Sequence, residues 1–394
     1  MKDEYRFDVV VIGAGASGLV CAQAASAGGL RTAVLERNSI PAKKIYATGN
    51  GRCNFTNEKA EFFSHTIGTM SSCFGIEAAF EDGRAYPRSM EASSVAQALV
   101  FAAEKAGAGI FCGAHVTRVR KNSLGFEAEC EDGRVFFAPR LVLACGGKAA
   151  IHMGCYGEGY KWASELGHSV IKPIPALDAL VCSEDISALH GVRVRAKAAL
   201  LAFDSDAQAG KLLAEESGEV QFTKDAVSGI CVMDLSRCVR TEEGRRFVLS
   251  LDLFPDVSAE DLAKLLADRA EAFGSGLCWM LPEKLIGYIQ KAVPAESFEA
   301  LAAAAKDLRF SIKGTRGWKS AQTTCGGVPL GEVDKQTFAS RIVPGLYITG
   351  EMLDYDGPCG GFNLDWAIHT GNAAGSGMLK DLQGAENEVD RQTT

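Results

Sequence analysis

The hydrophobic positions of the chain form short continuous runs near both ends and alternating runs in the middle. Near the N-terminus, Phe7–Ile12 is a β-branched run of the kind found in strands buried on both faces, and it stops at glycine. Residues 19–28 are small and compatible with a helix, and Thr32–Leu35 predicts a second strand that ends in Glu36. This order predicts a Rossmann-type strand, glycine loop, helix and strand.

The glycine loop has the G-x-G-x-x-G spacing at Gly13, Gly15 and Gly18. In a dinucleotide-binding loop the first glycine permits a tight turn, the second lets the pyrophosphate approach the backbone, and the third lets the helix pack on the strand. The first N–H groups of that helix would face the phosphates, and Glu36 is placed to accept from a ribose hydroxyl. The loop predicts a dinucleotide site, leaves FAD and NAD open, and disfavours NADP because of Glu36.

Four later segments bear on the choice between FAD and NAD. Lys43–Asn57 is a polar, glycine-rich loop too ordered in composition for a linker. Leu141–Gly147 predicts a buried strand ending in glycines, Gly345–Glu351 predicts a strand running into a loop, and Gly360–Asn363 opens a helix through about Gly375. A last strand and helix that complete the first domain are the layout of FAD proteins related to glutathione reductase and fumarate reductase.

The middle of the chain has a different pattern. Ala179–Cys182, Val192–Ala198, Ala199–Phe203 and Glu219–Thr223 predict short alternating strands, and therefore a small antiparallel sheet or barrel. Helical periodicity follows from Ser258. We expect an α/β fold with a discontinuous Rossmann-type FAD-binding domain (1–175 and 316–394), an inserted β-barrel-like domain (176–256 and 306–315) and a helical insert (257–305). The insertion is expected either to roof a substrate pocket or to serve as a dimer or packing surface.

Composition and charge narrow the class of protein. A chain of 394 residues with 47% apolar and 23% charged content predicts a globular protein, and a net charge of −8 with scattered basic residues disfavours nucleic acid as a partner. The odd count of 13 thinly spread cysteines favours a reducing cytoplasm, and none has the spacing of a metal site. No stretch has the ~20 uninterrupted apolar residues of a membrane span. We expect a small-molecule substrate, and the oligomeric state is left open.

Several motifs resemble those of the bacterial YhiN/BaiN-like flavoprotein family. They are a Gly-Arg-Cys-Asn-x-Thr-Asn loop at Gly51–Asn57, a Phe-Thr-x-x-x-x-Ser-Gly stretch at Phe222–Gly229, Gly-Glu-x-Leu-Asp at Gly350–Asp354 and Gly-Gly-Phe-Asn at Gly360–Asn363. The resemblance covers nearly the whole chain. The sequence departs from the family pattern at Cys145, Gly317 and Cys359, which affects details of the flavin environment.

The resemblance implies FAD as the cofactor. Its pyrophosphate would lie over the glycine loop, its ribose on Glu36, and its adenine against the backbone of Val116. The isoalloxazine would lie among the Thr48–Asn54 loop, the glycines after Glu351 and the N-terminus of the Phe362 helix. The full set of cofactor-binding residues expected is Gly13, Gly15, Ala16, Ser17, Gly18, Glu36, Arg37, Lys44, Thr48, Gly49, Gly51, Arg52, Cys53, Asn54, Val116, Ala144, Cys145, Gly146, Gly350, Glu351, Gly361, Phe362, Asn363 and Leu364.

Few side chains are candidates for acid–base or redox catalysis. Cys53 lacks the second cysteine a few residues away that a disulfide reductase needs, which favours a packing role for it over a reactive thiolate. Asp354 and Tyr355 lie in the loop before the paired glycines and are candidates for a proton donor, with Tyr46 a weaker one. Glu351 is favoured as a cofactor contact over a general acid.

These features predict an FAD-dependent oxidoreductase in which flavin N5 gives or takes a hydride. The resemblance implies reduction of a conjugated enone such as a dehydro-bile acid, or oxidation of an amine or aminoketone. A non-catalytic flavoprotein that transfers electrons or senses nucleotides is the alternative. Since no second G-x-G-x-x-G follows a strand, NADH or NADPH is expected to bind only transiently as an electron donor.

Overall fold

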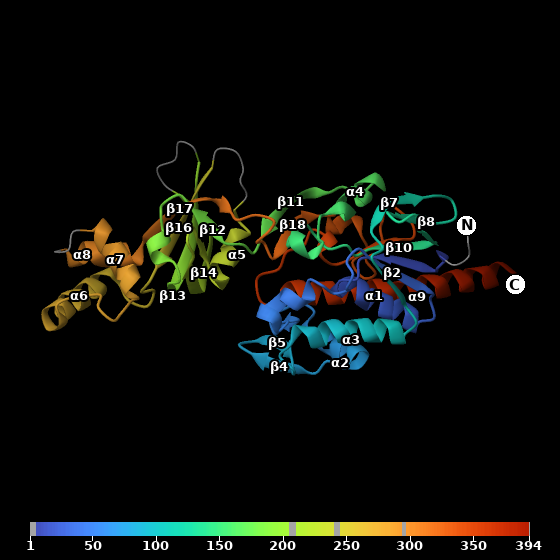
Figure 1. Cartoon of the computed structure of the whole chain (residues 1–394), viewed down its shortest axis with the longest axis horizontal. Coiled ribbons are helices and arrows are strands. Elements are labelled where there is room, and N and C mark those ends of the chain that lie inside the picture. The colour runs from blue at the N-terminus through green and yellow to red at the C-terminus, as the bar shows by residue number, and fades with distance from the viewer. Residues whose placement is uncertain (1–4, 205–209, 240–244, 294–296, 394) are drawn as a thin grey trace. The chain divides into compact units, whose positions relative to one another are not determined.

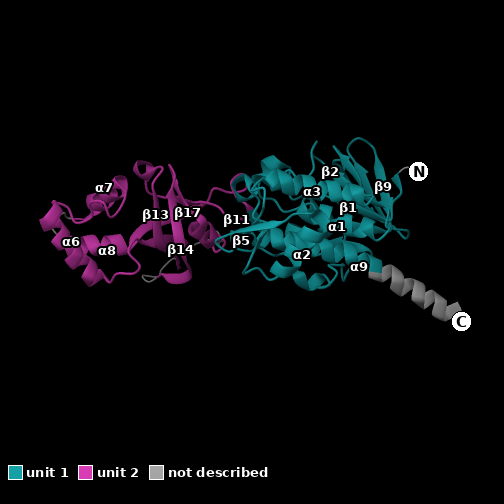
Figure 2. Ribbon diagram, turned by 90° about the horizontal axis from the view of Figure 1, so that it is seen from below, with its two compact units in different colours: residues 1–174, 323–394 teal, residues 175–322 magenta. Residues whose placement is uncertain are grey.

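The computed structural model describes residues 5–204, 210–239, 245–293 and 297–393, with side chains as far as residue 379. The chain forms two compact units. Unit 1 comprises residues 1–174 and 323–394, and unit 2 comprises residues 175–322 (Figure 2). No helix among the described residues has both the length and the apolar character needed to cross a membrane.

Unit 1 is built on a five-stranded parallel sheet. The strand order is β19 (Leu346–Ile348), β10 (Arg140–Leu143), β1 (Val9–Ile12), β2 (Thr32–Glu36) and β6 (Gly109–Cys112). Val9 and Val11 belong to one hydrophobic core and Val10 and Ile12 to another, so β1 is buried on both faces. This is why its sequence is a continuous apolar run.

Helices cover one face of this sheet and a smaller sheet covers the other (Figure 1). The helices are α1 (Ala16–Ala27), α2 (Phe63–Phe74), α3 (Ala92–Lys105) and α9 (Phe362–Thr393). The opposite face packs against the antiparallel strands β7 (Val116–Lys121), β8 (Phe126–Cys130) and β9 (Val135–Ala138), with α4 (Glu158–Glu165). A further three-stranded sheet has the order β3 (Thr56–Asn57), β5 (Arg84–Pro87) and β4 (Ala78–Glu81), and β11 (Ile171–Ala176) pairs with β18 (Thr323–Gly327).

Helices α1 and α9 pack closely through glycine. A Cβ added at Gly371 would lie 2.3 Å from the carbonyl oxygen of Ser17, and one added at Gly375 would lie 2.5 Å from that of Cys21. Gly375 therefore serves helix packing and does not end the helix. The expected end of α9 near Gly375 is wrong, because the helix runs on to Thr393.

Unit 2 contains a closed six-stranded barrel. Its strand order is β12 (Leu180–Cys182), β15 (Ala226–Ser228), β14 (Lys211–Phe222), β13 (Arg193–Phe203), β16 (Arg246–Asp252) and β17 (Leu308–Thr315). Helix α5 (Ile230–Ser236) accompanies the barrel, and α6 (Ala259–Phe273), α7 (Glu283–Ala292) and α8 (Phe298–Lys306) follow between β16 and β17. Leu266 of α6, Ile289 of α7 and Phe310 of β17 share one hydrophobic core, so the helices and the barrel pack as one body.

Two strands of the barrel are longer than the sequence pattern predicts. The segments expected as separate strands at 192–198 and 199–203 form the single strand β13, because its pairing with β14 and β16 is continuous across them, with one β-bulge between Leu200 and Leu201. The strand expected from Glu219 begins at Lys211, because backbone pairing with β13 continues through the polar residues Glu215 and Glu216. Hydrogen bonds between backbones do not require apolar side chains at those positions.

Candidate functional site

The three glycines of the N-terminal loop have different surroundings. A Cβ at Gly13 would lie 2.4 Å from the carbonyl oxygen of Ala144, and one at Gly18 would lie 1.9 Å from that of Gly13. These two glycines are needed for packing inside the protein. At Gly15, by contrast, an added Cβ meets nothing within 4 Å among the described residues. The open space therefore lies at the glycine that a pyrophosphate must approach.

Helix α1 begins directly after that open space. Its N-cap is Gly15, no side chain caps its first turn, and the first turn contains no acidic residue. Ala16 and Ser17 supply N–H groups at this end, where the helix dipole favours an anion. An uncapped helix end beside open space fits the phosphates of a dinucleotide.

Glu36 is held at the end of β2 by backbone groups. Its Oε2 accepts from the Ala14 N–H at 3.0 Å, and its Oε1 accepts from the Asn38 N–H at 2.8 Å. The side-chain Nδ2 of Asn38 also donates to Oε1 at 2.7 Å, so about one of the carboxylate's four lone-pair sites remains for a ribose hydroxyl. The Ala114 N–H donates to the Glu36 carbonyl oxygen, which brings the buried Val116 to the same end of the sheet. These positions fit the adenosine half of the cofactor.

Arg37 is engaged by other protein groups. Its guanidinium forms an ion pair with Glu158, approaches His115 Nε2 at 2.9 Å, and lies 4.4 Å from the ring centroid of Tyr156. These contacts hold the Arg37 side chain beside the N-terminus of α4. Direct contact of Arg37 with a cofactor stays a prediction.

Lys44, Glu351 and Thr324 connect three parts of the candidate site. Lys44 Nζ lies 2.7 Å from Glu351 Oε2, and Glu351 Oε1 accepts from the Thr324 N–H at 2.8 Å. The Thr324 hydroxyl oxygen in turn accepts from the backbone N–H groups of Lys148 and Ala149, just after β10. Burial lowers the pKa of Lys44, but attraction to Glu351 and Cys155 and the hydrogen bond to Glu351 together outweigh it and raise the pKa. Lys44 is therefore cationic at neutral pH.

The Thr48–Asn54 loop has an unusual backbone. Gly49, Asn50, Gly51 and Cys53 all have positive φ, and for Asn50 and Cys53, which carry side chains, this conformation costs energy. The Thr48 hydroxyl donates to the Ile45 carbonyl oxygen, and the Cys53 N–H donates to the Thr48 carbonyl oxygen at 3.0 Å. The loop is thus held in one shape by its own hydrogen bonds.

Cys53 and Arg52 both have neighbours that explain them. Burial raises the pKa of the Cys53 thiol to about 11, so it is protonated at neutral pH. This supports the packing role over a thiolate. Arg52 forms an ion pair with Glu81 at 2.8 Å and lies 4.6 Å from the ring centroid of Tyr86. Arg52 therefore ties its loop to the β4–β5 hairpin.

The N-terminus of α9 is joined to the loop that contains β3. A Cβ at Gly361 would lie 2.5 Å from the Thr56 carbonyl oxygen, and Asn57 Nδ2 donates to the Gly360 carbonyl oxygen at 3.0 Å. The Thr56 hydroxyl donates to Asp365 Oδ1 at 2.7 Å. Burial raises the pKa of Asp365 despite these hydrogen bonds. The predicted flavin-binding loops are therefore neighbours in space.

The three candidate proton donors differ in how closely they are attached to the N-terminus of α9. Tyr355 stacks on Trp366 of α9, with ring centroids 4.3 Å apart and planes at 16°, and a Cβ at Gly357 would lie 3.3 Å from its hydroxyl. Asp354 is fixed by its N–H, which donates to the Val328 carbonyl oxygen. Tyr46, two residues before Thr48, is 40% exposed. Tyr355 is the candidate most directly attached to α9.

Comparison with known proteins identifies the family. The sequence profile described as "HI0933-like protein Rossmann domain" matches residues 7–80 and 60–377. The chain belongs to the HI0933-like family. This confirms the resemblance to YhiN/BaiN-like flavoproteins, and with it a Rossmann FAD-binding fold and a flavoprotein oxidoreductase.

Two named relatives of this HI0933-like protein match along almost their whole length. The 3-dehydro-bile acid delta(4,6)-reductase of Clostridium scindens is 35% identical, over 93% of this chain and 97% of the relative. The ribosomal RNA dihydrouridine synthase of Escherichia coli is 28% identical, over 92% of this chain and 95% of the relative. Net charge therefore does not exclude nucleic acid as a partner, because this relative is named for an RNA substrate.

Solved structures confirm the predicted fold class. A flavocytochrome c3 fumarate reductase in an open conformation matches with a TM-score of 0.51 and 15% identity, over 96% of this chain and 78% of that one. A 3-ketosteroid delta1-dehydrogenase from Sterolibacterium denitrificans matches with a TM-score of 0.53 and 12% identity, over 96% and 100%. At such identities the likeness concerns the fold of this HI0933-like protein and nothing further.

The sequence interpretation missed several residues of the site. Thr324, Asp365 and Arg84 each lie beside a predicted cofactor loop, although none was singled out. Asp365 follows the Gly-Gly-Phe-Asn motif by two residues, which is a usable signal for a residue in the first turn of the helix. Arg84 is brought to Gly360 by the pairing of β5 with β3, so no local pattern marks it, whereas Thr324 lies in the Ala321–Val328 segment, which also resembles the family.

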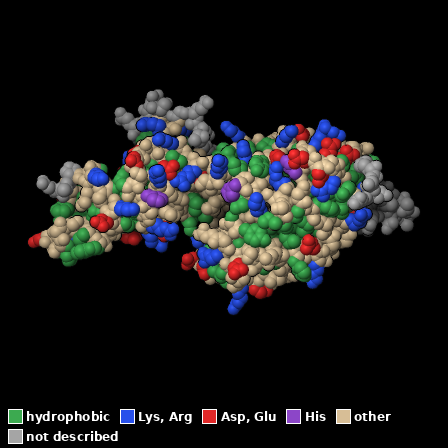
Figure 3. All heavy atoms as spheres, in the orientation of Figure 1, with side chains coloured by type: hydrophobic (Ala, Val, Ile, Leu, Met, Phe, Trp, Pro, Cys, Tyr) green, Lys and Arg blue, Asp and Glu red, His purple; other side chains and the backbone are tan. Residues whose placement is uncertain are grey.

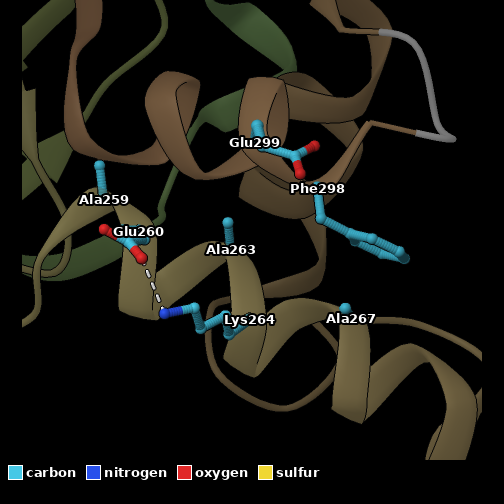
Figure 4. A pocket seen from close by; sticks show the side chains of 7 residues that line it. All are labelled: Ala259, Glu260, Ala263, Lys264, Ala267, Phe298 and Glu299. Atoms are coloured by element: carbon cyan, nitrogen blue, oxygen red, sulfur yellow. Dashed lines mark hydrogen bonds and ion pairs between the residues drawn. The ribbon is translucent and has the colours of Figure 1, made fainter.

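A groove of about 410 Å³ lies elsewhere, within unit 2. It runs between α6 and α8 and is lined by Ala259, Glu260, Ala263, Lys264, Ala267, Phe298 and Glu299 (Figure 4). Its charged groups include the Glu260–Lys264 ion pair at 2.8 Å, one turn apart on α6. On the face shown in Figure 3, acidic and basic side chains are interspersed over both units. The groove has no glycine loop among its lining residues, and the helix N-termini beside it are capped by Ser258 and Ser297 and carry Glu260 and Glu299, which disfavours a phosphate there.

Proposed function

We propose that this HI0933-like protein is an FAD-dependent reductase that saturates a carbon–carbon double bond conjugated with a carbonyl group in a small organic substrate. The observation that carries the proposal is the near full-length match to the bile acid delta(4,6)-reductase. Reduction of such a bond places a hydride on the β-carbon and a proton on the α-carbon, and the carbonyl oxygen holds the negative charge between the two events.

A second candidate is reduction of uridine in RNA, which the match to the dihydrouridine synthase favours. The double bond that is saturated in dihydrouridine is also conjugated with a ring carbonyl. The two candidates therefore share one reaction and differ in what surrounds the reacting bond. The net charge of −8 makes a long contact with RNA phosphates the less favourable case.

Separate residues of the chain would bind the cofactor and donate the proton in such a reaction. Bound FAD would supply the hydride chemistry at N5. Gly15 and the first turn of α1 would hold the phosphates, and Glu36 would hold the adenosine ribose. The N-terminus of α9 favours negative charge near Phe362. Tyr355 is the proposed proton donor, since its ring is fixed against Trp366.

NADH or NADPH is the proposed electron donor, bound transiently at the flavin. Oxidation of an amine or aminoketone, and electron transfer to a partner protein, are the competing activities. Anaerobic spectroscopy of the purified holoprotein separates them. The proposal expects bleaching of the yellow flavin by NADH or NADPH, and recovery of its absorption on adding an enone such as 4-androstene-3,17-dione.

The outcomes of this experiment are distinct. Recovery with uridine-containing ribosomal RNA and not with the enone would favour the second candidate. Bleaching by an amine in place of nicotinamide would favour the oxidase. No bleaching by either nicotinamide would contradict the proposed donor. Heat release of the bound ligand, with its mass and absorption, tests FAD itself.

A further inference from the structure

Arg84 is a cationic side chain beside the predicted flavin-binding glycines. It is the first residue of β5, the central strand of the β3-β5-β4 sheet, and its Cα pairs in register with Asn57 of β3. A Cβ added at Gly360 would lie 3.1 Å from Arg84 Nε and 3.7 Å from Asn57 Nδ2. The guanidinium is thus in contact range of the glycine two residues before Phe362, where α9 begins.

The acidic side chain opposite Arg84 pairs with another residue, so the Arg84 guanidinium can bind a ligand. Glu81 lies opposite Arg84 in the β4–β5 register, yet its carboxylate is taken by Arg52 at 2.8 Å. Among the residues that the structure describes, Arg84 has no side-chain hydrogen bond and no ion pair, although its side chain is half-buried. A half-buried guanidinium without an acceptor is costly, because its five donors are then only partly hydrated. An oxygen acceptor supplied from outside the chain would remove that cost.

A second feature points to the same kind of ligand. The first turn of α9 presents the positive end of a long helix next to Gly360, and Asn57 Nδ2 already donates to the Gly360 carbonyl oxygen at 3.0 Å. Gly360 has a φ of +115° and no side chain, so nothing from this residue lies between the guanidinium and the loop. A cation and a helix N-terminus together favour an oxygen that gains negative charge.

We propose that Arg84 binds the carbonyl oxygen of the substrate and stabilises the charge it acquires when the conjugated double bond is reduced. This inference rests on the proposed function and names its specificity-determining residue. In the balanced step, the β-carbon gains the hydride that reduced flavin would lose, the electron pair of the double bond forms a new bond between the α-carbon and the carbonyl carbon, and the carbonyl π pair moves to oxygen. The α-carbon then takes the proton of Tyr355, and the carbonyl bond re-forms. Arg84 holds the oxygen throughout and keeps its own protons.

The test uses the FAD-loaded protein and 4-nitrophenol, whose phenolate oxygen mimics the charged carbonyl oxygen. Arg84→Met should weaken phenolate binding about 10- to 100-fold, measured by titration of its absorption, and Arg84→Lys should lose less. Arg84→Met should also lower kcat for 4-androstene-3,17-dione. Arg88→Met removes a positive charge from an exposed position just after β5 and is the matched control, which should bind as the parent does.

Each contrary result has a separate meaning. If Arg84→Met keeps FAD and binds the phenolate like the parent, the role of Arg84 is overturned while the proposed reductase stands. If Arg84→Met loses FAD, Arg84 is a cofactor contact and the inference is again overturned. If the parent binds no phenolate, the inference fails, and if the parent also reduces no enone, the proposed function fails with it.

Discussion

Lys44 and Glu351 form an ion pair of 2.7 Å between Nζ and Oε2 across 307 positions of the sequence. The pair joins the segment after β2 to the turn after β19, and both carboxylate oxygens are used, since Oε1 accepts from the Thr324 N–H. It therefore fixes the position of one predicted cofactor loop relative to another. The contribution of this ion pair to stability depends on its partial burial, because fully exposed ion pairs stabilise a protein little.

Lys44→Met should destabilise the protein by about 1–3 kcal/mol, because it leaves the Glu351 carboxylate partly buried without its cation. Urea titration of the flavin-free protein measures the change. Lys43→Met is the matched control, since among the described residues Lys43 makes long hydrogen bonds of 3.4 Å, and it should change stability little. Adding Glu351→Gln to Lys44→Met should restore part of the loss, and additive effects would contradict coupling.

Gly15→Val should abolish FAD retention without unfolding the protein, because the new side chain would occupy the open space over the loop. Gly15 has a φ of −84°, which any residue can adopt. Gly18→Ala is the contrasting variant, since its Cβ would lie 1.9 Å from the Gly13 carbonyl oxygen and should cost about 1–3 kcal/mol. Flavin absorption per protein and thermal unfolding distinguish the two. A yellow Gly15→Val protein would place the phosphates elsewhere.

Cys53 should resist alkylation at neutral pH. Burial raises the pKa of its thiol to about 11, and the thiolate is the reactive form. A short pulse of iodoacetamide followed by peptide mass spectrometry should label the exposed Cys73 and leave Cys53 unmodified. Cys53→Ala should retain FAD and turnover. Rapid labelling of Cys53, or loss of turnover in a flavin-loaded Cys53→Ala protein, would support a reactive Cys53 thiolate instead.

His369 should make stability fall as the pH drops from about 6.5 to about 4. Burial, with a smaller contribution from the charge of His65, lowers the pKa of His369 to about 4, and its ring stacks on Phe62 at 3.5 Å. Between these values the unfolded chain binds the proton that the folded chain refuses, so acid favours unfolding. The effect levels off below about pH 4 and amounts to at most about 3 kcal/mol.

His369→Gln should flatten that part of the profile. Carboxyl groups titrate in the same range, and the pKa of the nearby Asp365 is raised, so the quantity to compare is the difference between parent and variant at each pH. Unfolding free energies from urea titrations at pH 4 to 7.5 supply it. A constant difference across this range would contradict the buried neutral histidine.

Tyr355→Phe should lower kcat about 100-fold or more while FAD binding and fold are retained, because the phenyl ring still stacks on Trp366 but has no proton to give. Tyr46→Phe removes a hydroxyl from an exposed position and should have little effect. Turnover of 4-androstene-3,17-dione as a function of pH measures both. Equal kcat in Tyr355→Phe and the parent would shift the role to Asp354.

The sequence by itself determined the parts whose signals are contiguous. The apolar run Val9–Ile12, the glycines that follow and Glu36 lie within one strand, loop, helix and strand, so spacing alone predicts the nucleotide site. The alternating middle segments likewise predicted a small antiparallel sheet or barrel, and the structure has the barrel. Strand lengths in unit 2 were underestimated, since pairing with a neighbour, as between β13 and β14, extends a strand through polar residues.

Only the tertiary structure decided which distant residues meet. Thr56 and Asp365 are 309 positions apart and share a 2.7 Å hydrogen bond, and Arg84 reaches Gly360 because β5 pairs with β3. Such contacts depend on the whole chain closing on itself, so no local periodicity records them. The sequence predicted a dinucleotide site, and the packing of loops around α9 decided which side chains lie near the place where the flavin ring is proposed to react.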